Sequence, residues 1–334
     1  MDGLFIVIVL IVIFALVFDF INGFHDTANA IATSVSTKAL TPRRAIILAS
    51  TMNFIGALTF TGVAQTITSG IANPFDLNNG TTVILGALIA AIAWNLITWY
   101  FGIPSSSSHA LIGGITGAVI ASAGFGAIQY KGFLSILEGL LISPFLAFGV
   151  GFVLYGIIKL IFKNSNLAKT NKRFRMVQVL TAAGQSYAHG TNDAQKSMGI
   201  ITMALIVGGM HETTDVPFWV QLSCATAMAL GTSVGGWRII KTVGGKIMKI
   251  RPVNGVAADL TGAAVIFGAT LFHLPVSTTH VISSAILGVG SSHRVKGVNW
   301  GVAKRMVVTW LITMPISALL GGLSYYLLLL FFGS

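Results

Sequence analysis

The sequence predicts an all-α polytopic membrane protein, made of two inverted-topology repeats with broken helices and two re-entrant hairpins tipped by serine and threonine. The first observation is composition, because the 334-residue chain is 54% hydrophobic and only 9% charged. A soluble domain carries about 25% charged residues. The second is length: apolar runs exceed the roughly 20 residues that a spanning helix needs, and they do not alternate as barrel strands do. The third is a series of motifs that occurs once in each half.

The first half contains five apolar runs. The run 4–21 lacks a preceding basic segment and cleavage site, so we expect a retained helix and not a signal peptide. Turn residues predict a loop at Asn73–Gly80. The runs that follow the first are, in order, 45–68, 82–101, 110–123 and 133–158.

The second half repeats this order after a short basic segment. We therefore divide the chain into a first repeat at 1–158, a basic cytoplasmic linker at 159–175 and a second repeat at 176–334. Asp193 follows Asp26 by 167 positions, and Pro275 follows Pro104 by 171, so the offset is nearly constant. The apolar runs of the second half are 177–207, 218–237, 257–272, 281–290 and 302–332.

The net charge of +11 does not indicate a nucleic-acid partner. The basic residues gather at the ends of apolar runs, as the positive-inside rule expects, and anionic lipid headgroups suit them better. Two such groups comprise Lys159, Lys163, Lys169, Lys172, Arg173 and Arg175, and then Arg238, Lys241, Lys246, Lys249 and Arg251.

Loop charges predict that the two halves insert in opposite orientations. The loop holding Lys38, Arg43 and Arg44 corresponds to a second-half loop holding Glu212 and Asp215. Because basic loops stay in the cytoplasm, this reversal indicates the inverted-repeat plan of secondary transporters. The same reasoning puts both termini outside, provided that each Pro-Ser/Thr segment is the tip of a re-entrant hairpin.

Each predicted tip is rich in hydroxyl groups and precedes a segment that can be helical. Non-helical backbone at membrane depth must be buried in protein or line a cavity. Free N–H groups and the positive end of a helix dipole suit an oxyanion. An ordinary helix cap is the alternative. The hydroxyl residues expected to bind such an oxyanion are Ser105, Ser106, Ser107, Ser108, Ser277, Thr278 and Thr279.

Two carboxylates lie inside apolar runs. Burying a charge at membrane depth costs free energy, so such residues are candidates for a functional site. Asp26 and Asp193 could hold a coupling cation together with Asn29 and Asn192, since hard cations such as Na⁺ prefer carboxylate and amide oxygens. They could carry H⁺ instead. A structural aspartate that caps a broken helix is the alternative.

Lys196 stands where the first repeat has Asn29. A buried ammonium could pair with Asp193, meet the anion, or replace a bound metal ion at one of two pseudo-symmetric positions. A lysine that extends to the membrane surface is the alternative. His109 and His280 follow the tips and are expected to orient them. His25 and His189 are candidates for proton movement, while weaker candidates without repeat support are Asp19, Asn22 and Asp259.

These motifs resemble the inorganic phosphate transporter (PiT) family of secondary transporters. The resemblance is carried by Gly190-Thr191-Asn192-Asp193, by its modified copy Gly23-Phe24-His25-Asp26, and by both hydroxyl tips. It implies uptake of inorganic phosphate across the plasma membrane through a midplane site, in a homodimer, with H⁺ or Na⁺ as the coupling ion and no other cofactor. The short linker is similar to that of compact prokaryotic members.

By the same resemblance, the two tips bind phosphate, and Asp26, Asn29, Asn192 and Asp193 lie near coupling ions. This chain departs from the family pattern at His25 and Lys196. Both departures favour H⁺ over a full set of Na⁺ sites.

Other functions remain open at this point. A permease for another oxyanion such as sulfate, or for a metal–phosphate complex, would use a similar site. An intramembrane hydrolase could use Ser108 and His109, but adjacency in sequence does not give triad geometry. A channel is the last alternative. We expect a transporter and not an enzyme.

Overall fold

The fold is helical throughout the part of the chain that the computed structural model describes, residues 2–73 and 79–332. This confirms the predicted all-α class. The loop expected at Asn73–Gly80 falls largely outside the described residues. The first-half helices are α1 (Asp2–Ser36), α2 (Pro42–Ala57), α3 (Gly62–Gly70), α4 (Gly80–Tyr100), α5 (Ser107–Ala123) and α6 (Tyr130–Ile161).

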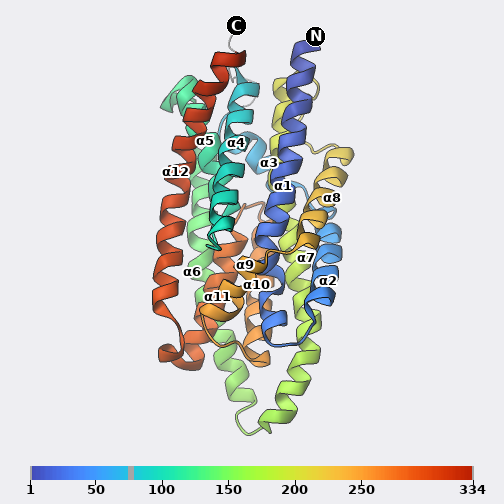
Figure 1. Cartoon of the computed structure of the whole chain (residues 1–334), viewed down its shortest axis with the longest axis vertical. Helices are drawn as coiled ribbons and strands as arrows, with labels where there is room; N and C mark the ends of the chain where they lie inside the picture. Colours follow the sequence, from blue (N-terminus) through green and yellow to red (C-terminus); the bar gives the residue numbers. More distant parts are fainter. Residues whose placement is uncertain (1, 74–78, 333–334) are drawn as a thin grey trace.

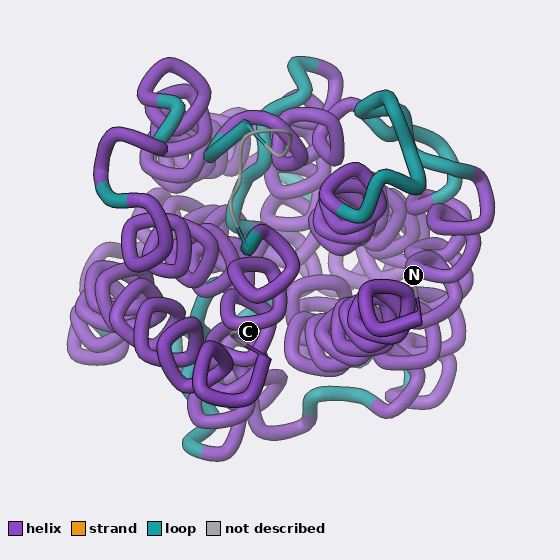
Figure 2. Tube along the Cα trace, turned by 90° about the horizontal axis from the view of Figure 1, so that it is seen from above, coloured by secondary structure: helices purple, strands orange, loops and turns teal. Residues whose placement is uncertain are grey.

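The second half follows the same plan of long helices with short breaks (Figures 1 and 2). A π-helical turn, Thr242–Lys246, follows α9. The second-half helices are α7 (Leu167–Val207), α8 (Phe218–Val234), α9 (Trp237–Lys241), α10 (Pro252–Leu271), α11 (Thr278–Arg294) and α12 (Trp300–Phe332).

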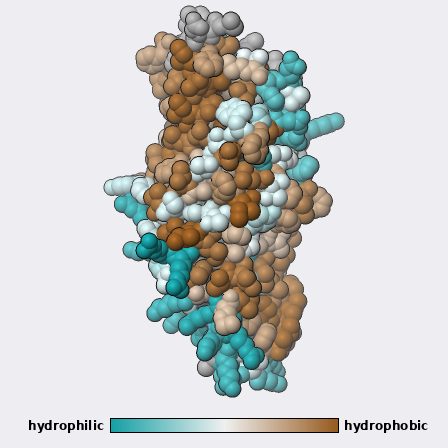
Figure 3. All heavy atoms as spheres, turned by 90° about the vertical axis from the view of Figure 1, so that its right-hand side faces the viewer, coloured by the Kyte–Doolittle hydropathy of each residue, from teal (hydrophilic) through white to brown (hydrophobic). Residues whose placement is uncertain are grey.

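Several helices have the length and composition of membrane spans. Among the described residues, α1, α4, α6, α10 and α12 are long and apolar enough to cross a bilayer. The pair α2–α3, bent by 68°, would make a sixth span. Hydrophobic residues cover much of the face seen in Figure 3, and hydrophilic ones gather at its lower end. The membrane class is therefore confirmed.

The duplicated stretch lies within unbroken helices. One alternative made its aspartates caps of a broken helix, yet α1 continues through Gly23–Ala30 and α7 through Gly190–Ser197. Several of their polar side chains bond to neighbouring helices, as Asn29 does to Thr279 and Asp193 to Thr278. The break lies between α2 and α3, where the Ala64 amide donates to Gln195 Oε1 over 3.1 Å.

Two helical hairpins carry the predicted tips. In Figure 1, α4 and α5 lie in the upper half of the bundle, whereas α10 and α11 lie in the lower half. Their packing is reciprocal: α5 packs on α12 and α11 on α6, while α1 packs on α8 and α7 on α2. Inverted repeats require this pattern. The inversion itself, and the membrane depth of the hairpins, stay predictions.

The predicted linker 159–175 is mostly helical. Because α6 ends at Ile161 and α7 begins at Leu167, the connection between the halves is shorter than the composition suggested. It lies at the lower end of the bundle, and the start of α1 and the end of α12 both lie at the upper end (Figure 1).

The signature glycines serve two close helix crossings. A Cβ added to Gly190 of α7 would lie 2.3 Å from the Asn53 carbonyl oxygen of α2. A Cβ added to Gly23 of α1 would lie 2.4 Å from the Met228 carbonyl oxygen of α8. Distances below 3.0 Å to backbone cannot be relieved by moving a side chain. These glycines therefore bring the signature helices into backbone contact with their neighbours.

We predict that Gly190→Ala destabilises the protein, because the new methyl group would push α7 away from α2. Overpacking of this kind costs about 1–3 kcal/mol. Thermal unfolding in detergent measures the effect. Gly184→Ala is the matched control on the same helix, since its Cβ would meet nothing within 4 Å. Equal melting temperatures for the two variants would contradict the crossing argument.

Candidate functional site

Both tips begin a helix with a serine cap. The Ser106 hydroxyl accepts from the His109 amide over 3.1 Å at the start of α5. The Ser277 hydroxyl accepts from the His280 amide over 3.2 Å at the start of α11. The capping alternative thus describes what these two hydroxyls do in the structure. A role for them in phosphate binding stays a prediction.

The two tips meet in the centre of the protein. Ser108 Oγ donates to the Val276 carbonyl over 2.9 Å, which ties one hairpin to the other. The rings of His109 and His280 lie 4.5 Å apart between their centroids. All seven predicted hydroxyl residues are at most 2% exposed. The sequence reasoning therefore chose two segments that the fold brings together.

Asp26 is the point where α1 meets both tips. Ser107 Oγ donates to its Oδ2 over 3.3 Å, and Thr279 Oγ1 donates to its Oδ1 over 3.1 Å. His25 Nδ1 lies 2.8 Å from the same Oδ1. Asn29 joins this group, because its Nδ2 donates to Thr279 Oγ1 over 2.9 Å. One carboxylate is thus linked to both hairpins.

Asp193 has the equivalent position on α7. Thr278 Oγ1 donates to its Oδ2 over 3.1 Å, and His189 Nε2 lies 3.1 Å from the same oxygen. Its other oxygen accepts from the Lys196 ammonium. Lys196 is 1% exposed, so it does not extend to the membrane surface. A buried charge requires such a partner.

Asn192 holds the second tip in place. Its Oδ1 accepts from the Val276 amide over 3.3 Å, and its Nδ2 donates to Thr270 Oγ1 and to the Leu274 carbonyl. These contacts span the bend between α10 and α11. They give Asn192 a positioning role; the predicted cation role remains untested.

Possible ligand atoms for a cation converge between α1 and α7. Asp26, His189 and Asp193 each offer a ligand atom, and these atoms all lie within 4.8 Å of one another. Asn29 Oδ1 is buried and has no hydrogen-bond partner among the described residues. A carboxylate with an open amide oxygen nearby suits a hard cation or a proton.

The histidines after the tips act on the hairpins. His109 Nδ1 lies 2.8 Å from Ser106 Oγ, and His280 stacks on Trp310 with 4.2 Å between ring centroids. Ser108 faces a carbonyl of the opposite hairpin and not a histidine. The ring of His109 thus contacts the first tip, whereas that of His280 packs on α12, and the orienting role of both stays a prediction. The contacts give no support to a Ser108–His109 nucleophile.

Several buried polar residues around the site escaped the sequence analysis. Thr98 Oγ1 lies 2.7 Å from Ser105 Oγ and 3.3 Å from His25 Nε2, so it links the first tip to α1. Asn53 Oδ1 lies 3.2 Å from His189 Nδ1. Thr98 and Asn53 are polar residues inside apolar runs, and that position could have marked them as candidates in the sequence. Asp19, which the sequence analysis named as a weaker candidate, is fully buried and faces Ser197.

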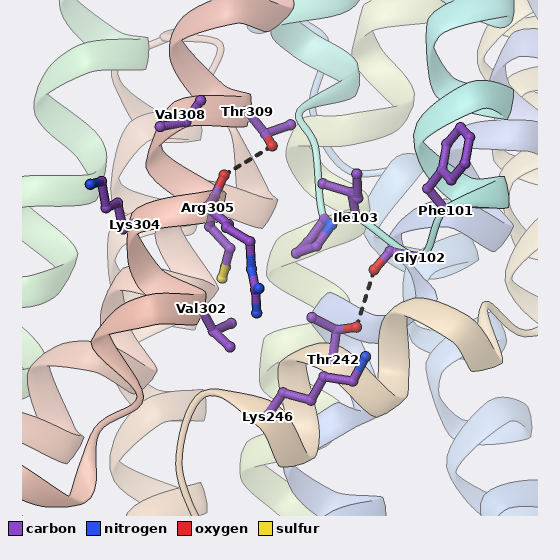
Figure 4. A pocket seen from close by; sticks show the side chains of 12 residues that line it. Phe101, Gly102, Ile103, Thr242, Lys246, Val302, Lys304, Arg305, Val308 and Thr309 are labelled. Carbon is purple, nitrogen blue, oxygen red and sulfur yellow. Dashed lines mark hydrogen bonds between the residues drawn. The ribbon is translucent and has the colours of Figure 1, made fainter.

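A cavity of about 490 Å³ reaches the base of the first tip. It is lined by Ile103 and Pro104, which precede Ser105, and by the basic residues Lys246, Lys304 and Arg305. Arg305 on α12 and Lys246 in the turn after α9 lie on different walls (Figure 4). Such a lining raises the local concentration of anions.

Comparison with known proteins decides the family. Residues 22–321 match the model of the phosphate transporter family. The chain belongs to that family. The family comprises transporters and not enzymes, which confirms that expectation.

Relatives of this transporter agree over almost its whole length. A "Probable low-affinity inorganic phosphate transporter" of Bacillus subtilis (strain 168) is 73% identical and covers 99% of this chain and 100% of its own. One of the same description from Rhizobium meliloti (strain 1021) is 46% identical over 93% of each chain. A solved structure titled "The sodium-dependent phosphate transporter" has a TM-score of 0.89 at 27% identity, covering 97% of this chain and 99% of its own.

We predict that Ser277→Ala lowers stability by about 0.5–2 kcal/mol, because the start of α11 loses its cap. Ser277→Thr keeps a capping hydroxyl and should restore most of that loss. Thermal or denaturant unfolding in detergent compares the two variants. An alanine variant as stable as the wild type would show that this cap contributes nothing.

Proposed function

We propose that this transporter imports inorganic phosphate by symport with H⁺ or Na⁺, at the site between the two tips. The observation that carries the proposal is the set of contacts between tip hydroxyls and site carboxylates. Ser107 and Thr279 donate to Asp26, and Thr278 donates to Asp193. The anion-binding donors and the cation-binding acceptors are therefore hydrogen-bonded to each other.

This arrangement couples the two ligands physically. While Asp26 is an uncompensated carboxylate, it holds the hydroxyls of Ser107 and Thr279 and repels an incoming anion. A proton or cation at Asp26 removes that charge and releases the hydroxyls toward phosphate oxygens. The free N–H groups at the starts of α5 and α11 then stabilise the phosphate charge. Each ligand thus favours the binding of the other.

We infer that H⁺ is the better candidate for the coupling ion. His25 lies 2.8 Å from Asp26, and Lys196 already pairs with Asp193, so the second repeat offers less room for Na⁺. The solved relative is titled sodium-dependent, which keeps Na⁺ as the alternative. In the sodium form, the ligands would be Asp26, Asn29, Asn192 and Asp193.

Phosphate would be distinguished from sulfate by its P–OH group. At neutral pH phosphate carries at least one proton that it can donate, whereas sulfate carries none. Asn29 Oδ1 and the carboxylates are acceptors at the site. A site built to accept a substrate hydroxyl rejects an analogue that lacks it. This favours phosphate over the sulfate alternative.

Transport would move the hairpins against the surrounding helices, as in other inverted-repeat transporters. The basic cavity below Pro104 is suited to release, because it lies beside the first tip and is lined by Lys246 and Arg305. Loop charges support a plasma-membrane orientation with both termini outside and the 159–175 segment in the cytoplasm. A homodimer, and the division into repeats 1–158 and 176–334, are further parts of the proposal.

The transport proposal is tested with purified protein in liposomes. We expect accumulation of labelled phosphate when an inward H⁺ or Na⁺ gradient is imposed, and loss of accumulation when an ionophore collapses that gradient. Excess sulfate should compete little. Uptake that ignores both gradients would refute symport, and turnover far above carrier rates would indicate a channel.

Asp26→Asn should abolish accumulation, since the amide keeps the shape of Asp26 but cannot take up the coupling charge. Because the neutral amide resembles the occupied Asp26, phosphate should still bind, and its affinity should no longer depend on the concentration of H⁺ or Na⁺. Binding and uptake assays measure the two effects.

Asp259→Asn is the matched control for this variant. Asp259 is also buried and accepts from two threonines, Thr33 and Thr181, but it contacts neither tip. It should retain gradient-driven uptake. Full activity in Asp26→Asn, or equal loss in both variants, would contradict the role given to Asp26.

A further inference from the structure

The two repeats make matching contacts at one end of the site. Ser107 donates to Asp26, and Thr278, its counterpart 171 positions later, donates to Asp193. Each carboxylate also has a histidine partner, His25 in one case and His189 in the other. In these hydroxyl and histidine contacts, the two halves are therefore alike.

The match ends one helical turn further along. Asn29 and Lys196 are counterparts, 167 positions apart. Asn29 Nδ2 donates to Thr279, and its Oδ1 is left open. Lys196 donates to Asp193 itself. Thus the first repeat presents a carboxylate that has no ammonium partner, together with a free amide oxygen, whereas the second presents a carboxylate already joined to an ammonium.

The difference between Asn29 and Lys196 changes the net charge of the site. Both aspartates are at most 1% exposed, and their ligand atoms lie within 4.8 Å of each other. Two bare carboxylates so close would repel each other and any anion. Lys196 neutralises one of these charges, that of Asp193, so no cation from solution is needed there. A single cation at Asp26 is then enough to neutralise the remaining carboxylate.

We propose that the Lys196 ammonium is a tethered cation that occupies the second-repeat counterpart of the coupling-ion position. Only the first-repeat position, at Asp26 and Asn29, takes an exchangeable H⁺ or Na⁺. The inference rests on the proposed phosphate symport and specifies its charge balance. The lysine stays with the protein through the cycle, so its charge is never carried across with phosphate.

The test is the charge moved per phosphate in proteoliposomes. H⁺ and Na⁺ are kept equal on both sides, a phosphate gradient is imposed, and the membrane voltage is set with K⁺ and valinomycin. The dependence of the zero-flux voltage on the phosphate gradient gives the charge moved per phosphate, whichever cation is used. Lys196→Asn, which copies Asn29 into the second repeat, should move one more elementary charge per phosphate than the wild type. Its uptake should also depend more steeply on cation concentration.

Lys169→Asn is the control, because Lys169 lies exposed on the same helix. It should leave the charge per phosphate unchanged. An unchanged charge in Lys196→Asn would overturn the tethered-cation role while leaving phosphate symport intact. Wild-type liposomes that accumulate no phosphate would instead refute the proposed function.

A second variant separates a loss of transport from a loss of folding. It is needed because Lys196→Asn leaves the Asp193 carboxylate buried without its ammonium, which destabilises the protein. Asp193→Asn/Lys196→Asn removes both charges, so the site keeps its net charge. The uptake of this double variant should be slower than in the wild type, because Thr278 loses its carboxylate partner, but it should move one elementary charge fewer per phosphate than Lys196→Asn. Loss of uptake in both variants would overturn the proposal, because the lysine would then be needed for more than its charge.

Discussion

The structure depends on burying two carboxylates near each other in the centre of an apolar bundle. Asp26 and Asp193 are enclosed by helices that would span a bilayer, and neither carboxylate meets water. Such groups are tolerated only with partners. Hydroxyl groups from two hairpins, two histidines and one lysine supply those partners. The hairpins are thus held at the site by the same charges that, in our proposal, bind the coupling ion.

The glycines of the duplicated stretch serve this arrangement. Gly23 and Gly190 bring α1 and α7 into backbone contact with α8 and α2, and both helices continue unbroken through the stretch. An intact helix fixes the direction of its side chains. Rigid helices can therefore present Asp26 and Asp193 to the tips with defined geometry, while the hairpins provide the parts suited to movement.

Duplication gives the site two similar halves, and substitution has made them unequal. Hydroxyl–carboxylate contacts are shared by both halves, but Lys196 and Asn29 differ. Symmetry in the framework suits a transporter that opens to two sides. In our proposal, the asymmetry in charge sets how many ions must accompany one anion. These two properties rest on different residues and can vary independently.

The sequence alone determined the membrane class, the order of the apolar runs and the two sets of polar residues, because these depend on composition and on the repetition of motifs. It did not determine that Ser106 and Ser277 cap their helices, that Asn192 holds the second tip, or that α1 and α7 remain unbroken. The two caps use amides only three residues away, whereas Asn192 depends on Val276, which is far away in the chain. Only the packed structure decides which distant groups come within bonding distance.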